Sequence, residues 1–210
     1  MSTTTTAANS ALVVDGQQYA YVDSIKYLGC TISIPLDPRK EITQRVQAGW
    51  GVFSQYKHFL ESAYTPMALK RKLFDSCVSP AVLYASETWT LTKHVANKLR
   101  ISQRKMERRM PGVTLRERKT NEWLRQRTGV ADWVDKVCLR KVRWMARIRD
   151  MDRSRLAKRV TEWTPREGKR SRGRPMMRWR DMLVKMMGTT AFLRASDEEL
   201  LNGLRTQHVI

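Results

Sequence analysis

The sequence lacks the residue patterns on which most self-contained active sites depend. Its 210 residues include three histidines and three cysteines, and their scattered positions form no spacing suited to zinc. It has no adjacent pair of aspartates, although polymerases hold two Mg²⁺ ions with converging carboxylates that include such a pair. It has neither a G-x-x-x-x-G-K-[ST] phosphate loop nor an H-E-x-x-H motif. We therefore expect no enzymatic activity, no bound metal and no cofactor.

Other absences bear on the cellular compartment. Cys30, Cys77 and Cys138 are odd in number and far apart, which is typical of a reducing compartment rather than of a disulfide framework. No window approaches the roughly eighteen apolar residues that a membrane-spanning helix needs. Residues 1–10 are polar and low in complexity, so we expect a disordered terminus and no signal peptide. An intracellular location, nuclear or cytoplasmic, is expected.

Acidic residues are scarce in one part of the chain. The formal net charge is +20, and residues 98–185 hold 29 basic and 10 acidic residues, which give +19 in that block alone. Such a field favours polyanions, with nucleic acid first and an anionic membrane second. We expect nucleic acid as the partner, and no membrane or small-molecule substrate.

The N-terminal part predicts short strands. Leu12–Val14 and Tyr19–Val22 flank Asp15-Gly16, a dipeptide typical of two-residue hairpin turns. A third short strand is expected from Ile25 to Ile34.

A long apolar segment, Thr65–Trp89, predicts the central helix. Thr65 suits the N-cap and Pro66 the first turn. Apolar residues recur every four positions, with a second row beside them, so the helix is expected to be buried on most sides. Pro80 is expected to kink it. The two rows are Leu69, Leu73, Cys77, Ala81 and Ala85, and Phe74, Val78 and Val82.

Further helices are expected on both sides of this segment. Asp37-Pro38 begins one, with Gly49 allowing close packing on its apolar face. Another begins near Thr92 and stops at Pro111-Gly112. Three helices joined by short connections favour an antiparallel bundle. The two buried faces would hold Ile42, Val46, Phe53, Tyr56 and Leu60, and Val95, Leu99, Ser102, Met106 and Met110.

The basic block predicts more helices. The capping box Thr114–Glu117 would open a fourth, which Gly129 closes. Asp132 would cap a fifth. Two shorter helices are expected at Asp152–Trp163 and Met176–Met187, joined by a flexible basic loop at residues 164–175. The apolar arc of the fifth helix would hold Val134, Val137, Cys138, Val142, Trp144, Met145 and Ile148.

Five separate motifs follow one another along the chain. They are K-Y-L-G at 26–29, V-S-P-A-V-L-Y-A-S-E-T-W at 78–89, R-x-R-K-x-N-E-W-x-R-x-R-T-G-V at 116–130, R-K-V-R-W at 140–144, and R-V-T-E-W at 159–163 leading into G-R-P and R-W at 173–179. In this order they resemble the C-terminal part of reverse transcriptases from non-LTR (LINE-type) retrotransposons. The similarity covers about Leu12 to Gly188.

The resemblance implies the end of the palm, the thumb and the region beyond it. In such enzymes a K-Y-L-G-type turn forms the primer grip, which would correspond to Lys26, Tyr27, Leu28 and Gly29. On residue types alone the same four residues are an ordinary strand and turn, and both interpretations stay open. The upstream palm with its paired aspartates and an endonuclease domain are missing. The chain therefore resembles a non-catalytic fragment from the end of a longer polyprotein.

We expect a mainly α fold in five parts. Residues 1–10 would be disordered, 11–34 a β-hairpin element, 35–112 a thumb-like helical bundle, 113–188 a basic helical nucleic-acid-binding region, and 189–210 a divergent tail.

The candidate nucleic-acid-binding residues fall into two groups. A stripe opposite the apolar arc of the fifth helix is either a solvated face or a phosphate contact. Cations without interleaved acids repel one another, so phosphate contact is favoured. The basic loop is a nuclear-localisation patch, a nucleic-acid arm or a solubilising linker. The residues are Lys136, Arg140, Arg143 and Arg147 in the stripe, and Lys169, Arg170, Arg172, Arg174 and Arg178 in and after the loop.

Other residues have simpler interpretations. Trp144, Trp163 and Trp179 lie at apolar helix positions, which favours core packing over base stacking. Asp150 and Asp152 lie between arginines at a helix boundary, where capping and ion pairing are favoured over metal binding. A stand-alone nucleic-acid-binding protein and a non-functional transposon relic remain the alternatives to a reverse transcriptase fragment that grips template, primer or target DNA.

Overall fold

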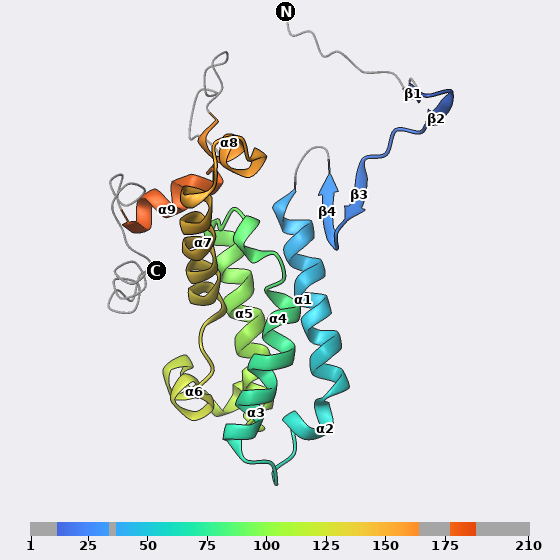
Figure 1. The fold of residues 1–210 in the computed structure, drawn as a ribbon. Coiled ribbons are helices and arrows are strands. Elements are labelled where there is room, and N and C mark those ends of the chain that lie inside the picture. The colour runs from blue at the N-terminus through green and yellow to red at the C-terminus, as the bar shows by residue number, and fades with distance from the viewer. Residues whose placement is uncertain (1–11, 34–36, 164–176, 188–210) are drawn as a thin grey trace, which may run out of the picture. The chain divides into compact units, whose positions relative to one another are not determined.

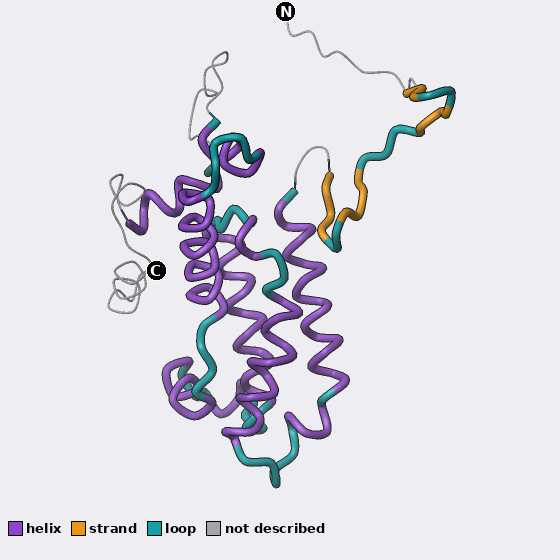
Figure 2. Tube along the Cα trace, viewed as in Figure 1, coloured by secondary structure: helices purple, strands orange, loops and turns teal. Residues whose placement is uncertain are grey.

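The computed structural model describes residues 12–33, 37–163 and 177–187. Helices dominate this part of the chain, and its strands are confined to the N-terminal region (Figures 1 and 2). The mainly α fold is confirmed. The chain divides into two compact units, residues 1–41 and 42–210. No helix among the described residues is long and apolar enough to cross a membrane.

The first unit contains two separate antiparallel hairpins. Strands β1 (Leu12–Val14) and β2 (Gln17–Tyr19) pair in the register Leu12 to Tyr19. Asp15 and Gly16 connect them with φ of 50° and 77°, as a type I′ turn requires. The hairpin predicted around Asp15-Gly16 is confirmed, although its second strand begins earlier than Tyr19–Val22.

The prediction of a single strand from Ile25 to Ile34 is wrong. It folds back on itself as β3 (Ser24–Tyr27) and β4 (Cys30–Ser33). Leu28 and Gly29 form the turn, both with positive φ of 48° and 78°. This conformation suits glycine and is uncommon for leucine. The backbone at 26–29 is thus the strand and turn that the residue types alone indicate. The backbone N–H of Thr31 donates to Glu41 Oε2 at 2.9 Å.

The second unit contains the core. Helix α1 (Pro38–Gln55) begins as predicted, because Asp37 Oδ1 accepts a hydrogen bond from the Arg39 N–H at 2.9 Å. From residue 42 onward its apolar face is buried, and the short helix α2 (Lys57–Leu60) follows it. Gly49 lies against Val82, because a Cβ added there would be 2.1 Å from Val82 Cγ2. The close approach predicted for this glycine is confirmed.

We expect Gly49→Ala to lower the free energy of unfolding by about 1–3 kcal/mol, because its methyl group overlaps a buried side chain. Val82→Ala alone should lower it by about 2–4 kcal/mol. The double variant should be more stable than the sum of the two effects predicts, since Val82→Ala removes the overlapping methyl. Urea denaturation of the four proteins measures this coupling.

Gly51 supplies a matched control on the same helix. A Cβ there would meet nothing within 4 Å, so Gly51→Ala should stabilise the protein by about 0.5–1 kcal/mol through helix propensity. Additive effects of Gly49→Ala and Val82→Ala would contradict the close contact.

The central segment is helical but not one continuous helix. It comprises α3 (Met67–Leu73), a π-helical turn η1 (Phe74–Val78), α4 (Ser79–Val82) and, after a break, the 3₁₀ turn η2 (Ser86–Thr88). The expected helix Thr65–Trp89 is therefore too long at both ends. Ala85 has a φ of 54°, which α-helix does not allow. Instead of a simple kink at Pro80, a π-turn precedes the proline.

The buried side of this segment also differs from the expected one. Phe74, Val78 and Val82 are fully buried, whereas Leu69 is 50% exposed and Leu73 is half-buried. The row that faces the core begins at Lys70, whose Nζ donates to the Met110 carbonyl at 2.5 Å. Burial lowers the pKa of Lys70. A lysine thus occupies a core-facing position, although its charge favours the surface.

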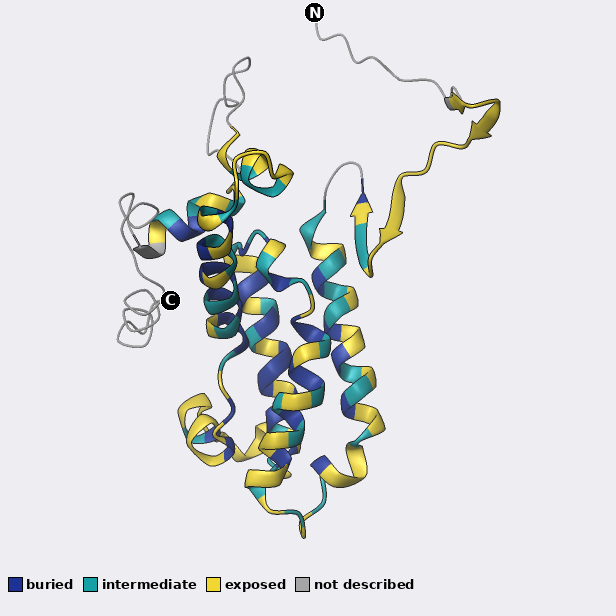
Figure 3. Ribbon diagram, viewed as in Figure 1, coloured by how far each residue is buried: buried dark blue, intermediate teal, exposed yellow. Residues whose placement is uncertain are grey.

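Helix α5 (Lys93–Arg109) agrees with the sequence prediction. Thr92 Oγ1 accepts from the Val95 N–H at 3.3 Å as the N-cap. All of its predicted core residues are buried, and Figure 3 shows α5 buried along much of its length. Phe53, Phe74 and Trp133 form a chain of aromatic contacts with ring centroids 6.5 Å and 5.8 Å apart. Helices on both sides of Pro111-Gly112 therefore share one core.

The capping box at Thr114–Glu117 is present, but it does not open a long helix. It caps the N-terminal end of a single 3₁₀ turn, η3 (Leu115–Glu117), after which Arg118 has a φ of 50°. Helix α6 (Asn121–Thr128) has its own N-cap, because Thr120 Oγ1 accepts from the Trp123 N–H at 3.1 Å. Gly129 ends it as predicted, with a φ of 64°.

Helix α7 (Trp133–Asp150) is capped by Asp132 as predicted, since its Oδ1 accepts from the Val134 N–H at 2.9 Å. Two shorter helices follow, α8 (Leu156–Glu162) and α9 (Trp179–Met187). The core position predicted for Trp163 is wrong, because this side chain is 68% exposed at the end of a helix with no buried residue. The expected disordered terminus, basic loop and tail lie outside the described residues.

Candidate nucleic-acid interface

The structure divides the predicted basic stripe of α7 into two halves. Lys136 Nζ forms an ion pair with Asp75 Oδ1 at 2.5 Å, and Arg140 donates from its guanidinium to the Leu83 carbonyl. Both cations therefore attach α7 to the central segment. Arg143 and Arg147 are exposed, and their side chains form no hydrogen bond or ion pair with another described residue.

The other candidate residues lie elsewhere. Arg178 is exposed just before α9, and its backbone N–H donates to Asp181 Oδ2 at 2.8 Å. The loop residues Lys169, Arg170, Arg172 and Arg174 lie outside the described part of the chain. Lys26 and Tyr27 end β3, and Leu28 and Gly29 form the turn of its hairpin. The side chains of Tyr27 and Leu28 are 60% and 74% exposed.

Lys141 is a structural residue that sequence reasoning missed. Its side chain is fully buried, and Nζ donates to the carbonyls of Trp89 at 2.7 Å and Trp179 at 3.3 Å. The same ammonium group lies 4.8 Å from the centre of the Trp179 ring, a cation–π distance. Burial lowers the pKa of Lys141 to about 8. Its position within the apolar arc, between Cys138 and Val142, was the available signal.

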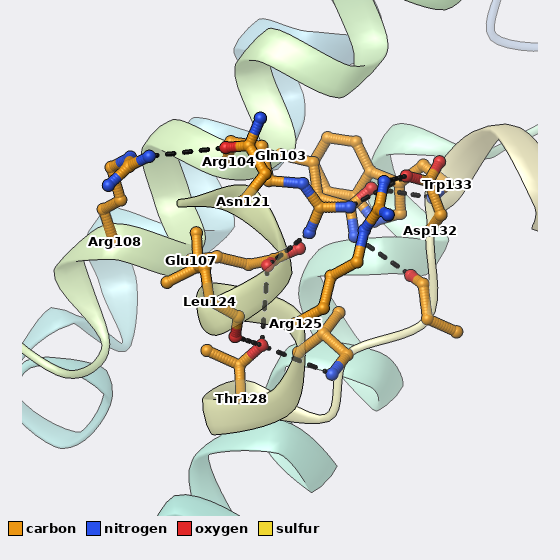
Figure 4. Close-up of polar contacts among 12 residues, drawn as sticks. Gln103, Arg104, Glu107, Arg108, Asn121, Leu124, Arg125, Thr128, Asp132 and Trp133 are labelled. Atoms are coloured by element: carbon orange, nitrogen blue, oxygen red, sulfur yellow. Dashed lines mark hydrogen bonds and ion pairs between the residues drawn. The ribbon is translucent and has the colours of Figure 1, made fainter. Parts of the chain in front are cut away.

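A second set of buried polar residues connects three helices (Figure 4). The guanidinium of Arg104 on α5 donates to Glu107 Oε2 at 2.5 Å and to Asp132 Oδ2 at 2.8 Å. Thr128 on α6 donates to the same Glu107 oxygen at 3.4 Å. Glu107 is fully buried, and desolvation raises its pKa although Arg104 acts in the opposite direction.

Gln103 completes this connection. Its Oε1 accepts from the Trp133 N–H at 2.7 Å, and its Nε2 donates to the Ala131 carbonyl at 3.0 Å. The first turn of α7 is thereby fixed against α5. We interpret Gln103, Arg104, Glu107, Thr128 and Asp132 as a structural network, because its polar groups bind elements of the fold to one another.

The two aspartates near the end of α7 behave as the sequence predicts. Asp150 Oδ1 pairs with Arg149 Nε at 2.9 Å, and Asp152 Oδ1 accepts from the Ser154 N–H at 2.8 Å. These contacts lower the pKa of both carboxyl groups. In the described part of the chain, no three His, Cys, Asp or Glu side chains gather as a metal ion would require.

Comparisons with known proteins give one informative likeness. No protein-family model matches the chain, and no solved structure matches it. An uncharacterized transposon-derived protein of Caenorhabditis elegans is 36% identical over 184 residues, which are 86% of this chain and 64% of that protein. The chain therefore spans about two-thirds of the relative's length. This likeness supports a transposon-related origin for the chain.

Proposed function

We propose that this chain is a non-catalytic fragment of a LINE-type reverse transcriptase that binds nucleic acid through phosphate contacts. RNA, DNA or a hybrid duplex would be held by Arg143 and Arg147 on α7, together with Arg178 and the basic loop at residues 164–175. The observation that carries the proposal is the difference along α7. Lys136 and Arg140 contact protein atoms, whereas Arg143 and Arg147 are exposed without a partner in the described residues.

Exposed cations without an ion-pair partner among the described residues suit a phosphate backbone. They lie in a block of the chain with a net charge of +19, which attracts polyanions of any sequence. Contacts to phosphate displace condensed counterions and carry no base specificity. A nuclear location would agree with this role, since the basic loop also resembles a nuclear-localisation patch.

We expect the full chain to bind a short DNA duplex with an affinity that falls steeply between about 50 and 200 mM salt. Arg143→Gln/Arg147→Gln should flatten the slope of log K against log salt by about 2, because each lost phosphate contact contributes about 0.9. Glutamine keeps helix propensity, so circular dichroism should be unchanged. Fluorescence anisotropy at several salt concentrations measures the slope.

Lys72→Gln/Lys93→Gln is the matched control. Both lysines are exposed and lie outside the basic block, so this variant loses the same charge from another place and should keep most of the slope. An equal change in both variants would show a general charge effect rather than a site. Absence of salt-dependent binding in the wild-type chain would favour the alternative of a non-functional transposon relic.

A further inference from the structure

A groove lies beside the buried network, and the contacts described so far give it no function. It has a volume of about 600 Å³ and lies along α5, with walls from α1, α6 and the segment around η3. Six of its lining residues are arginine or lysine, and no aspartate or glutamate lines it. The positively charged lining residues are Arg100, Arg104, Lys105, Arg108, Arg109 and Arg125.

Several of these cations are already neutralised by protein carboxylates. Arg104 and Arg125 both contact Asp132, and Arg109 contacts Glu61 at 3.5 Å. Lys105 differs, because it is exposed and its side chain has no hydrogen bond or ion pair with another described residue. The groove therefore presents positive charge that is only partly compensated.

Arg108 gives a second, independent sign of a missing acceptor. Its Nη2 donates to the Lys119 carbonyl at 3.1 Å and to Asn121 Oδ1 at 3.3 Å, and Figure 4 shows it directed toward Asn121. Its Nη1 is buried and lacks a hydrogen-bond partner among the described residues. An unsatisfied buried donor on a charged group is unfavourable. Arg108 also lines the groove, so a rotation of its guanidinium toward a bound anion would give this donor an acceptor.

Apart from Asn121, the remaining lining is apolar. Ile101 and Leu115 are 58% and 76% exposed, although side chains of this type are usually buried. Trp50 lies at the other side, with the Arg109 guanidinium 5.1 Å from its ring centre. A ligand for this groove must therefore combine negative charge with an apolar face.

We infer that the groove binds an unpaired nucleotide of a single strand, with its phosphate on Lys105 and Arg108 and its base against Ile101 and Leu115. A phosphate joined to a planar base has both required properties, and sites for single strands combine basic grooves with base-contacting side chains. The volume lies within the range of about 300–1,000 Å³ typical of concave ligand sites. Paired bases within a duplex are covered by their partners and cannot reach such a groove.

This inference rests on the proposed nucleic-acid binding for the class of ligand, but it uses residues outside the α7 stripe. The test is therefore a comparison of two probes with the full chain. The first is oligothymidylate of about ten nucleotides, within the site sizes of single-strand-binding folds, and the second is a duplex of equal length. The groove variant is Lys105→Gln/Leu115→Ala, which changes two exposed side chains.

We expect the groove variant to bind oligothymidylate about tenfold more weakly, from the loss of one base contact and one phosphate contact. Its affinity for the duplex should change less than about threefold, because one phosphate contact is lost at most. The matched control, Lys93→Gln/Leu156→Ala, removes another exposed lysine and another exposed leucine and should leave the preference between probes unchanged. Circular dichroism should match the wild type for both variants.

Three outcomes would contradict the proposal that the groove binds an unpaired nucleotide. Equal losses on both probes would show general electrostatics, and displacement of oligothymidylate by adenosine monophosphate at equal concentration would show a site for free nucleotides. Displacement by polyglutamate of equal charge would show a site for an acidic protein segment. Failure of the proposed function is distinct, since the wild-type chain would then bind neither probe.

Discussion

Replacing Arg104 with methionine should lower the free energy of unfolding by about 3–5 kcal/mol, because it leaves buried carboxylates without their cation. Arg104 lies 2.5 Å from Glu107 and 2.8 Å from Asp132, and the Glu107 side chain is fully buried. Guanidinium chloride denaturation followed by circular dichroism measures the loss. Arg149→Met is the control, since its partner Asp150 is 67% exposed and a solvent-accessible ion pair should matter little.

The stability lost in Arg104→Met should depend on pH, and the buried position of Glu107 determines the direction. Desolvation already raises the pKa of Glu107, while Arg104 lowers it. Without Arg104 the folded-state pKa of Glu107 rises further above its unfolded value. The variant is then most stable below the unfolded pKa and loses stability as pH rises through the folded pKa. Its deficit relative to the wild type should therefore be smaller at pH 5 than at pH 8.

A second substitution makes the ion-pair explanation refutable. Arg104→Met/Glu107→Met replaces the buried pair with apolar side chains and should recover much of the stability. A double variant as unstable as Arg104→Met at both pH values would show that packing, rather than the uncompensated charge, explains the effect.

The sequence predicts the helices of this fold better than its charged interior. Caps and apolar spacing place α1, α5 and α7 correctly, because both are local properties of the chain. Charged residues are usually exposed, yet Lys70, Arg104 and Lys141 are buried. Each has at least one partner far away in sequence, such as the Met110 carbonyl for Lys70 and Asp132 for Arg104. Those partners are known only when the chain has folded.

Errors in the predicted elements concentrate where the backbone leaves regular geometry. Leu28, Ala85 and Arg118 all have positive φ, a conformation that side chains of these types rarely adopt. At Leu28 the expected strand turns back, and at Ala85 and Arg118 the expected helices are interrupted. At Ala85 and Arg118 the residue types favour continuation of a helix, so tertiary contacts rather than local preference determine these two breaks.

The candidate sites, like the fold, could be predicted from the sequence only in part. Spacing along one helix groups Lys136, Arg140, Arg143 and Arg147 into one stripe, but it does not reveal that Asp75 and the Leu83 carbonyl engage the first two. The groove along α5 was not predicted. Its cations come from α5 and α6, and its apolar residues come from α1, α5 and the segment around η3. No spacing within one element therefore marks it.

Replacing Trp133 with alanine should lower the free energy of unfolding by about 3–5 kcal/mol, as large-to-small changes of fully buried aromatic residues do. Trp133 is the largest fully buried side chain, and its ring stacks on Phe74 at 5.8 Å with an interplanar angle of 11°. Its position joins α7 to the central segment, so the cavity would open where the helices of the core meet. Urea denaturation followed by circular dichroism measures the loss.

Two further variants separate the ring from its polar group. The indole Nε1 donates to Ser79 Oγ at 3.0 Å, and Ser79 is itself buried. Trp133→Phe keeps an aromatic ring but removes this donor, and should cost about 1–3 kcal/mol. Trp133→Phe/Ser79→Ala should be less unstable than the sum of the single changes, because the donor and acceptor leave together. A loss below about 1 kcal/mol for Trp133→Ala would show that the site is not part of a close-packed core.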